Sequence, residues 1–161
     1  MGNHASPKNI STNTSPTAVA DFYEHACNFC SLIDTTSSVD QDIAANILSS
    51  MLDIYREILR LPQTEAADYD PPCNFFAPTK LSFGIQDCYW EIHDPTHLDE
   101  PVCGSLYDDC LEIYKILKNG CLLYESENTA EAADYWKLEF ENHGKYHAAD
   151  AIRALTFILD K

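Results

Sequence analysis

The strongest constraint on the fold is the spacing of apolar side chains at steps of three and four residues along several segments. Residues 17–34 and 39–61 each carry one such stripe. The more regular stripe contains Ile43, Ile47, Met51, Ile54, Ile58 and Leu61. Because an α-helix turns about 100° per residue, side chains at this spacing fall on one face. Both segments are therefore predicted to be amphipathic helices that bury one face.

Local signals mark the ends of the second helix. Ser38 or Asp40 is placed to accept a hydrogen bond at its N-terminus, and Pro62 stops it. A short helix is predicted over residues 81–93, although Gly84 weakens that pattern.

Two further long helices follow. Ser105 is a suitable N-cap for a helix over residues 106–124. Asn128, with Glu131 three residues later, resembles a capping box and begins a last helix that runs to the end of the chain. No strand-like alternation stands out. The sequence therefore predicts an all-α fold, an antiparallel helical bundle of about four long helices plus one short helix.

The chain divides into a tail and one domain. Residues 1–16 are mostly Ser, Thr, Asn and Pro and are predicted to be a flexible polar tail. Residues 17–161 are predicted to form a single helical bundle domain. Within it, residues 62–80 form a long proline-containing loop, whose Phe75 and Phe76 either enter the core or wait for a partner.

Charge and hydropathy exclude several classes of function. Ten basic and 26 acidic residues give a formal net charge of -16, which repels nucleic acid and anionic membrane. No run approaches the roughly 18 apolar residues of a membrane span. The N-terminal residues also lack the apolar core of a signal peptide. We therefore expect a soluble cytoplasmic protein that binds neither nucleic acid nor membrane.

The seven cysteines are expected to be reduced in such a compartment. Cys27, Cys30, Cys110 and Cys121 lie within apolar helical patterns and are predicted to be core residues. The Cys27-x-x-Cys30 spacing also permits a zinc or redox interpretation. Against it, no second pair has zinc-ligand spacing and no βαβ pattern surrounds it.

Polar side chains of the last predicted helix are spaced to share one stripe. They lie four, four and three residues apart: Glu139, His143, His147 and Asp150. Histidine and carboxylate on an inner helix face are typical metal ligands in bundles. His143, His147 and Asp150 are therefore candidate metal ligands. Asp109 and Glu112, on the preceding helix, are the nearest further ones.

Two other interpretations fit the same stripe. His147 can be a hydrogen-bonded core histidine, with Glu139 and His143 at the solvent boundary, or the stripe can serve acid–base catalysis. No cofactor is predicted, because the chain has neither a Gly-x-Ser-x-Gly elbow nor a phosphate-cradling glycine loop. Arg153 borders the buried face and needs an acidic partner. The sequence predicts a bridge from Arg153 to Asp109, and loss of Arg153 should then destabilise by about 3 kcal/mol or more if the pair is buried.

Two functions from different classes follow. The first is an interaction or accessory module that binds a protein partner. It would use the 62–80 loop and an aromatic groove lined by Tyr89, Trp90, Tyr135 and Trp136. The alternative is a metal-binding or metal-dependent bundle enzyme that uses the histidines and Asp150. The sequence specifies neither the partner nor the oligomeric state.

Three segments together resemble a known family. They are YWEIHDP (Tyr89–Pro95), GSLYDDCLEIYKILKNG (Gly104–Gly120) and YWKLEFENHGKYHAADAIRAL (Tyr135–Leu155). In order and spacing the chain is similar, from about Val19 to its end, to the uncharacterised bacterial all-α family catalogued as domain of unknown function 5063. The resemblance implies an all-α fold and carries no activity.

Overall fold

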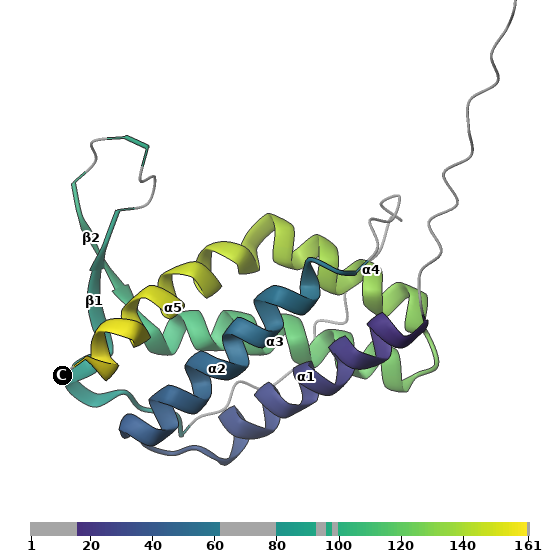
Figure 1. Ribbon diagram of the computed structural model, residues 1–161, viewed down its shortest axis with the longest axis horizontal. Helices are drawn as coiled ribbons and strands as arrows, with labels where there is room; N and C mark the ends of the chain where they lie inside the picture. The colour runs from purple at the N-terminus through teal and green to yellow at the C-terminus, as the bar shows by residue number, and fades with distance from the viewer. Residues whose placement is uncertain (1–15, 62–79, 93–95, 98–99, 161) are drawn as a thin grey trace, which may run out of the picture.

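The computed structural model describes residues 16–61, 80–92, 96–97 and 100–160 (Figure 1). The predicted tail and the predicted 62–80 loop, with Phe75 and Phe76, lie outside these ranges except for Pro16 and Lys80. The helices are α1 (Pro16–Thr35), α2 (Gln41–Ile58), α3 (Leu106–Glu125), α4 (Thr129–Glu139) and α5 (Lys145–Leu159). The shorter elements are a 3-10 turn (Gly84–Gln86), β1 (Cys88–Glu91), β2 (Val102–Ser105) and a π-helical turn (Phe140–Gly144).

The long helices form an antiparallel bundle. In Figure 1, α1 runs back along α2, and α5 runs back along both α2 and α3. The packed pairs are α1 with α2, α1 with α3, α2 with α5, α3 with α4 and α3 with α5. The predicted helical-bundle fold is confirmed. None of the described helices is both long enough and apolar enough to cross a membrane.

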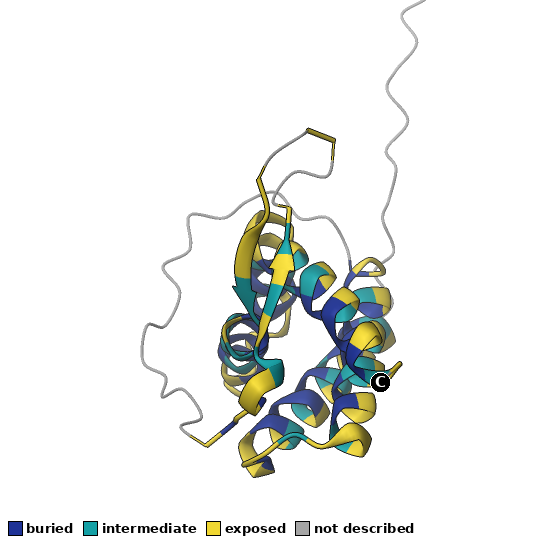
Figure 2. Cartoon of the chain, turned by 90° about the vertical axis from the view of Figure 1, so that its left-hand side faces the viewer, coloured by how far each residue is buried: buried dark blue, intermediate teal, exposed yellow. Residues whose placement is uncertain are grey.

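The core lies where the apolar stripes of the helices meet. Figure 2 shows their buried faces turned toward one another and their exposed faces turned outward. Trp136 of α4 is fully buried, and its indole Nε1 donates to the carbonyl of Leu117 on α3 at 3.2 Å. A Cβ on Gly120 would fall only 2.0 Å from that Nε1 atom. Gly120 therefore lets α3 and α4 approach across the tryptophan.

Two of the predicted caps form and one does not. The side chain of Asp40 accepts from the backbone N–H of Ile43 at 2.9 Å, and that of Ser105 accepts from Asp108 N–H at 3.1 Å. The predicted capping box at Asn128 is wrong, because the Asn128 side chain makes no cap hydrogen bond and donates to the hydroxyl of Ser126.

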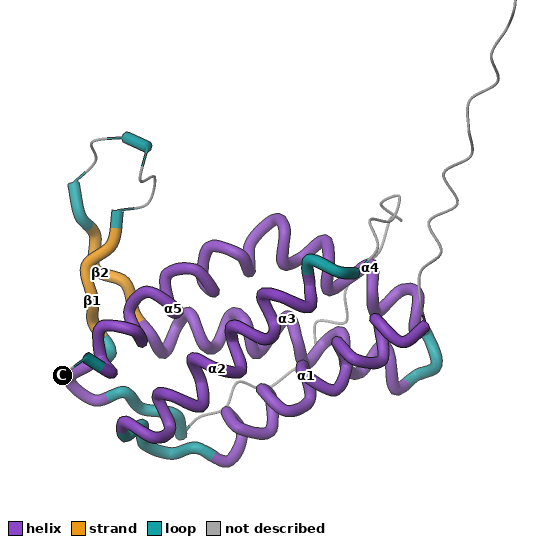
Figure 3. Tube along the Cα trace, in the orientation of Figure 1, coloured by secondary structure: helices purple, strands orange, loops and turns teal. Residues whose placement is uncertain are grey.

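The region predicted as a short helix is helical only in its 3-10 turn, and the residues after it form a strand. β1 pairs with β2 in antiparallel register, with Tyr89 opposite Gly104. Figure 3 shows the two strands at one end of the bundle, beside the end of α5. A Cβ on Gly104 would lie 2.6 Å from the Tyr89 ring, so glycine lets the ring lie across the partner strand.

A disulfide joins Cys88 of β1 to Cys103 of β2, so the expectation of fully reduced cysteines is wrong for this pair. The predicted core position is confirmed for Cys30, Cys110 and Cys121, which are buried free thiols. Cys27 is half-buried, with its Sγ 3.7 Å from that of Cys121.

The predicted last helix is continuous but not uniform. The π-helical turn over Phe140–Gly144 separates α4 from α5. A π turn adds a residue to the helical repeat and therefore rotates the faces that follow, and such turns are frequent at functional sites. His143 lies in this turn and His147 in the first turns of α5.

Candidate functional site

A polar cluster lies where β1, α3 and α5 meet, and Asp109 is its centre. Asp109 is in the first turn of α3, where the helix dipole favours a negative charge, and only 6% of its surface is exposed. The hydroxyl of Tyr89 donates to its Oδ2 at 2.5 Å, and Nδ1 of His147 lies 2.8 Å from its Oδ1. Because a carboxylate only accepts, Nδ1 of His147 carries the proton in that contact. Each Asp109 oxygen thus has one donor, from two different elements.

The second imidazole nitrogen of His147 faces another histidine. Nε2 of His147 lies 3.1 Å from Nε2 of His143, and that atom lies 3.5 Å from Oε2 of Glu112. When His147 is neutral, His143 donates across this contact, and when His147 is charged it donates instead. The hydrogen bond to Asp109 raises the pKa of His147, against the lowering effect of burial. The buried Asp109 carboxylate therefore orients the ring of His147, and the two imidazoles share one hydrogen bond.

Tyr89 stays a donor in this arrangement. Burial and the adjacent Asp109 carboxylate raise the pKa of its phenol well above the ordinary value. The hydroxyl remains protonated and anchors β1 to α3.

Asp150 and Arg153 occupy positions that differ from their predicted ones. Burial, and then the negative charges of Glu91 and Asp109, raise the pKa of Asp150 to about 6, while Arg153 acts in the opposite direction. Asp150 therefore faces other acids and not the imidazole pair.

The predicted bridge between Arg153 and Asp109 is wrong. Arg153 is exposed, and its Nη2 donates to the carbonyl oxygen of Trp90 at 3.0 Å. His147, earlier on α5, reaches Asp109 instead. Arg153 ties α5 to β1, and His147 ties α5 to α3.

The structure brings together only part of the predicted metal-ligand set. His143, His147 and Glu112 approach one another, and Asp109 lies behind His147. In the part of the chain that the structure describes, no three His, Cys, Asp or Glu side chains are grouped to hold one metal ion. The arrangement instead offers two imidazole nitrogens on adjacent helical turns.

The four predicted groove residues do not line one groove. Tyr135 and Trp136 are buried in the core, where the Tyr135 hydroxyl accepts from Nδ2 of Asn119 at 3.3 Å. Trp90 is exposed and Tyr89 is half-buried, and these two residues line one cavity without the other two. The physical reason is that α4 turns its aromatic residues toward α1 and α3, away from the hairpin.

A different apolar surface surrounds the hairpin. It consists of Ile85, Trp90 and Phe157, whose exposed fractions are 101%, 69% and 65%. They come from the 3-10 turn, β1 and α5, and they border a cavity of about 390 Å³. Cys88 and Arg153 also line this cavity. We call these three apolar residues, together with Cys88 and Arg153, the hairpin surface. Trp90 was predicted from the sequence as a binding residue, whereas Ile85 and Phe157 were not. The only signal of these two residues is a large apolar side chain outside a helical stripe.

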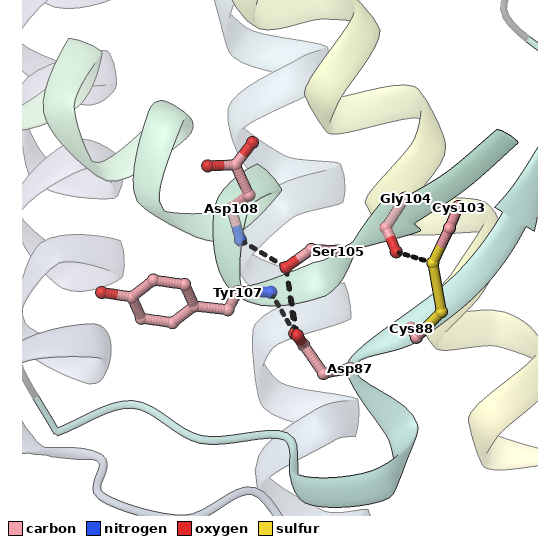
Figure 4. The surroundings of a disulfide bond; sticks show 7 residues. All are labelled: Asp87, Cys88, Cys103, Gly104, Ser105, Tyr107 and Asp108. Carbon is pink, nitrogen blue, oxygen red and sulfur yellow. Dashed lines mark hydrogen bonds between the residues drawn. A yellow bond between two sulfur atoms is a disulfide. The ribbon is translucent and has the colours of Figure 1, made fainter.

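The base of the hairpin is held by Asp87. Its carboxylate accepts from the hydroxyl of Ser105 at 3.1 Å and from the backbone N–H of Tyr107 at 2.7 Å (Figure 4). The Asp87 carbonyl accepts from Leu106 N–H at 2.9 Å. These bonds join the start of β1 to the junction of β2 with α3, next to the disulfide. The hairpin is therefore fixed at its base.

The fold and the polar cluster define a small all-α bundle protein with a disulfide-linked hairpin at one end. Over residues 13–161 the chain matches the family described as Domain of unknown function (DUF5063), and it belongs to that family. The resemblance inferred from the three segments is confirmed. No curated protein and no solved structure matches the chain.

Proposed function

We propose that this protein is an interaction module whose protein partner docks on the hairpin surface. The observation that carries the proposal is the gathering of three strongly exposed large apolar side chains, Ile85, Trp90 and Phe157, around one cavity. Single exposed apolar residues are ordinary on a protein surface, whereas a contiguous patch marks an interaction site. Tryptophan is among the residues most often found as binding hot spots.

The hydrogen bonds of the site favour a surface that is formed before binding. The backbone carbonyl of Trp90 is held by Arg153, and Tyr89 is held by Asp109. Asp87 fixes the base of the same strand. A surface ordered in advance loses less conformational entropy when it binds a partner. The polar cluster therefore supports this function by anchoring the hairpin.

A matched pair of substitutions tests the proposal. Phe157 and Leu59 are both 65% exposed, but Leu59 lies at the end of α2 and outside the cavity lining. Tagged parent, Phe157→Ser, Trp90→Ser and Leu59→Ser proteins are purified at matched levels from the native host, and co-purifying proteins are quantified. Loss of one large apolar contact costs about 1.5–3 kcal/mol, or roughly tenfold or more in affinity. The partner should fall by that factor with Phe157→Ser and with Trp90→Ser, and should stay with Leu59→Ser. Equal recovery from all four proteins would refute the docking surface.

A second candidate function is transition-metal binding, and one observation favours it. The Nε2 atoms of His143 and His147 lie 3.1 Å apart, close to the spacing of two nitrogens bound to one ion at about 2.0–2.1 Å. Asp109 on Nδ1 of His147 is the arrangement that orients metal-bound imidazoles in proteins. With two protein nitrogens, the ion would complete its coordination with water or partner groups, and Glu112 is the nearest carboxylate to His143.

Calorimetric titration of untagged protein with Ni²⁺ and Zn²⁺ tests this second function. One equivalent should bind, and His143→Ala or His147→Ala should each abolish it. His25→Ala, on α1, is the control and should bind like the parent. Binding that survives the loss of His143 or His147, or no binding by the parent, would exclude this site.

A further inference from the structure

We propose that the cavity of the hairpin surface is a thiol–disulfide exchange site for a cysteine carried by an apolar peptide segment. The Cys88–Cys103 disulfide joins two exposed residues, and Cys88 lies in the cavity wall with Trp90 and Phe157. Exposed disulfides are the ones that take part in exchange. The inference rests on the proposed docking function and specifies the chemistry of the docked segment.

The arrangement selects the sulfur that is attacked. Cys88 lines the cavity, whereas Cys103 belongs to β2 and its Sγ lies 3.5 Å from the carbonyl of Gly104. A thiol held between Trp90 and Phe157 therefore meets the sulfur of Cys88. Arg153 lines the same cavity, and its positive charge favours a thiolate over a thiol there.

The exchange balances in two steps. The partner's thiolate forms a bond to Sγ of Cys88 as the Cys88–Cys103 bond breaks, and the Cys103 sulfur leaves as a thiolate that takes a proton from water. A second cysteine of the partner then attacks the partner's own sulfur in the mixed disulfide and releases the Cys88 thiol. The partner's cysteine pair is oxidised to a disulfide by two electrons, and the hairpin disulfide is reduced to two thiols.

The other described cysteines are poorly suited to this chemistry. Cys110 is fully buried, and burial raises its thiol pKa well above the ordinary value. Burial also raises the pKa of Cys27 to about 11. Neutral thiols are weak nucleophiles, and a fully buried one such as Cys110 is also poorly accessible. Exchange among the described residues is therefore directed to the hairpin.

Net charge adds selectivity among thiols. The chain carries a formal charge of -16, which disfavours the approach of anionic thiols such as glutathione. An uncharged peptide with apolar residues beside its cysteine gains contact with Trp90 and Phe157 instead. The site should therefore prefer apolar peptide thiols to glutathione.

The test compares acetyl-Leu-Cys-Phe-amide with glutathione at equal thiolate concentration. Free thiols are alkylated before digestion, and opening of the disulfide is followed by mass spectrometry of the tryptic peptide 81–115, which contains Cys88, Cys103 and the buried Cys110. Fragmentation locates the adduct. The parent should react roughly tenfold faster with the apolar peptide, a ratio that one buried apolar side chain can supply. The ratio should fall toward one in Phe157→Ser and stay high in Leu59→Ser.

A trapping variant gives a positive readout. Cys103→Ser leaves Cys88 as a thiol, which should form a stable mixed disulfide with the symmetric disulfide of the same peptide. In Cys88→Ser, the remaining Cys103 thiol should react with the peptide disulfide no faster than it reacts with oxidised glutathione.

Three results would overturn the exchange site: equal rates for the two thiols in the parent, a ratio unchanged by Phe157→Ser, or an adduct on Cys103. If Phe157→Ser loses the protein partner but leaves the thiol ratio unchanged, the exchange site fails and the docking surface stands.

Discussion

Replacing Asp109 with Asn removes the charge at the centre of the polar cluster while nearly keeping its volume. The carboxylate uses one oxygen for the Tyr89 hydroxyl and the other for Nδ1 of His147. An amide has only one acceptor oxygen, and its NH₂ group would face one of these two donors. Asp109→Asn therefore removes the charged acceptor, and both partners stay bonded only when His147 is the neutral tautomer whose Nδ1 accepts from the amide.

The structure sets the size of this effect. A hydrogen bond to a charged group contributes about 1.5–3 kcal/mol. We therefore expect the free energy of unfolding to fall by about 1.5–3 kcal/mol. At roughly 2–4 °C per kcal/mol for a domain of this size, the melting temperature should fall by about 3–12 °C.

The loss also depends on pH, with a sign that follows from His147. Its folded pKa lies above the ordinary value of 6.5, because the charged imidazole gains the Asp109 carboxylate. The stability from that charge is therefore fully present below pH 6.5 and is lost as the pH rises through the folded value. The Asn variant lacks this contribution, so the gap between parent and variant should be widest at low pH and narrow above it.

Thermal melts of the parent and Asp109→Asn between about pH 5 and pH 9 measure both effects. Asp108→Asn is the matched control, because Asp108 is in the same helical turn but exposed. If Asp109→Asn melts within 1–2 °C of Asp108→Asn, or if the gap widens as the pH rises, the reasoning about the cluster is refuted.

Further predictions concern packing and charge. Gly120→Ala places a Cβ against Trp136 and should lower the free energy of unfolding by about 2–4 kcal/mol, measured with denaturant. Gly84→Ala is the control, because Gly84 has a φ of +59° but open space around it, and it should cost only about 1 kcal/mol. The pKa of Asp150 is raised to about 6, so its charge opposes folding above that pH. Asp150→Asn should raise the free energy of unfolding at pH 7.5 by about 1 kcal/mol after solvent screening, and should give no gain near pH 4. Arg153→Ala should cost about 0.5–1.5 kcal/mol in the same unfolding assay, not the 3 kcal/mol or more of a buried ion pair.

The helices could be predicted because each buries one face. The stripe of α2 repeats over five turns, and Asp40 and Ser105 cap their helices with their own side chains. The hairpin could not be predicted in the same way. Its strands contain four residues each, which is too few to show an alternation of apolar and polar side chains. They are joined by Asp87 and by the Cys88–Cys103 disulfide, contacts between residues 15 or more positions apart in the sequence.

The polar cluster was predicted in part, because Tyr89 was expected in an aromatic groove and Asp150 beside the histidines. The spacing of His143 and His147 and the position of Asp109 pointed to one site, and the structure brings the three together. The register between α3 and α5 depends on the π-helical turn, which a uniform helical wheel does not contain. In that register His147 contacts the Asp109 carboxylate, and Arg153 donates to the carbonyl of Trp90 instead.

The central claim is that the hairpin surface is where a partner docks, and site-specific photo-crosslinking in the native host tests it most directly. A benzophenone amino acid is placed at position 157 in one variant and at position 59 in another, because Phe157 and Leu59 are equally exposed. We expect one discrete adduct of defined mass from position 157 and none from position 59. No adduct from position 157, or the same adducts from both positions, would contradict it.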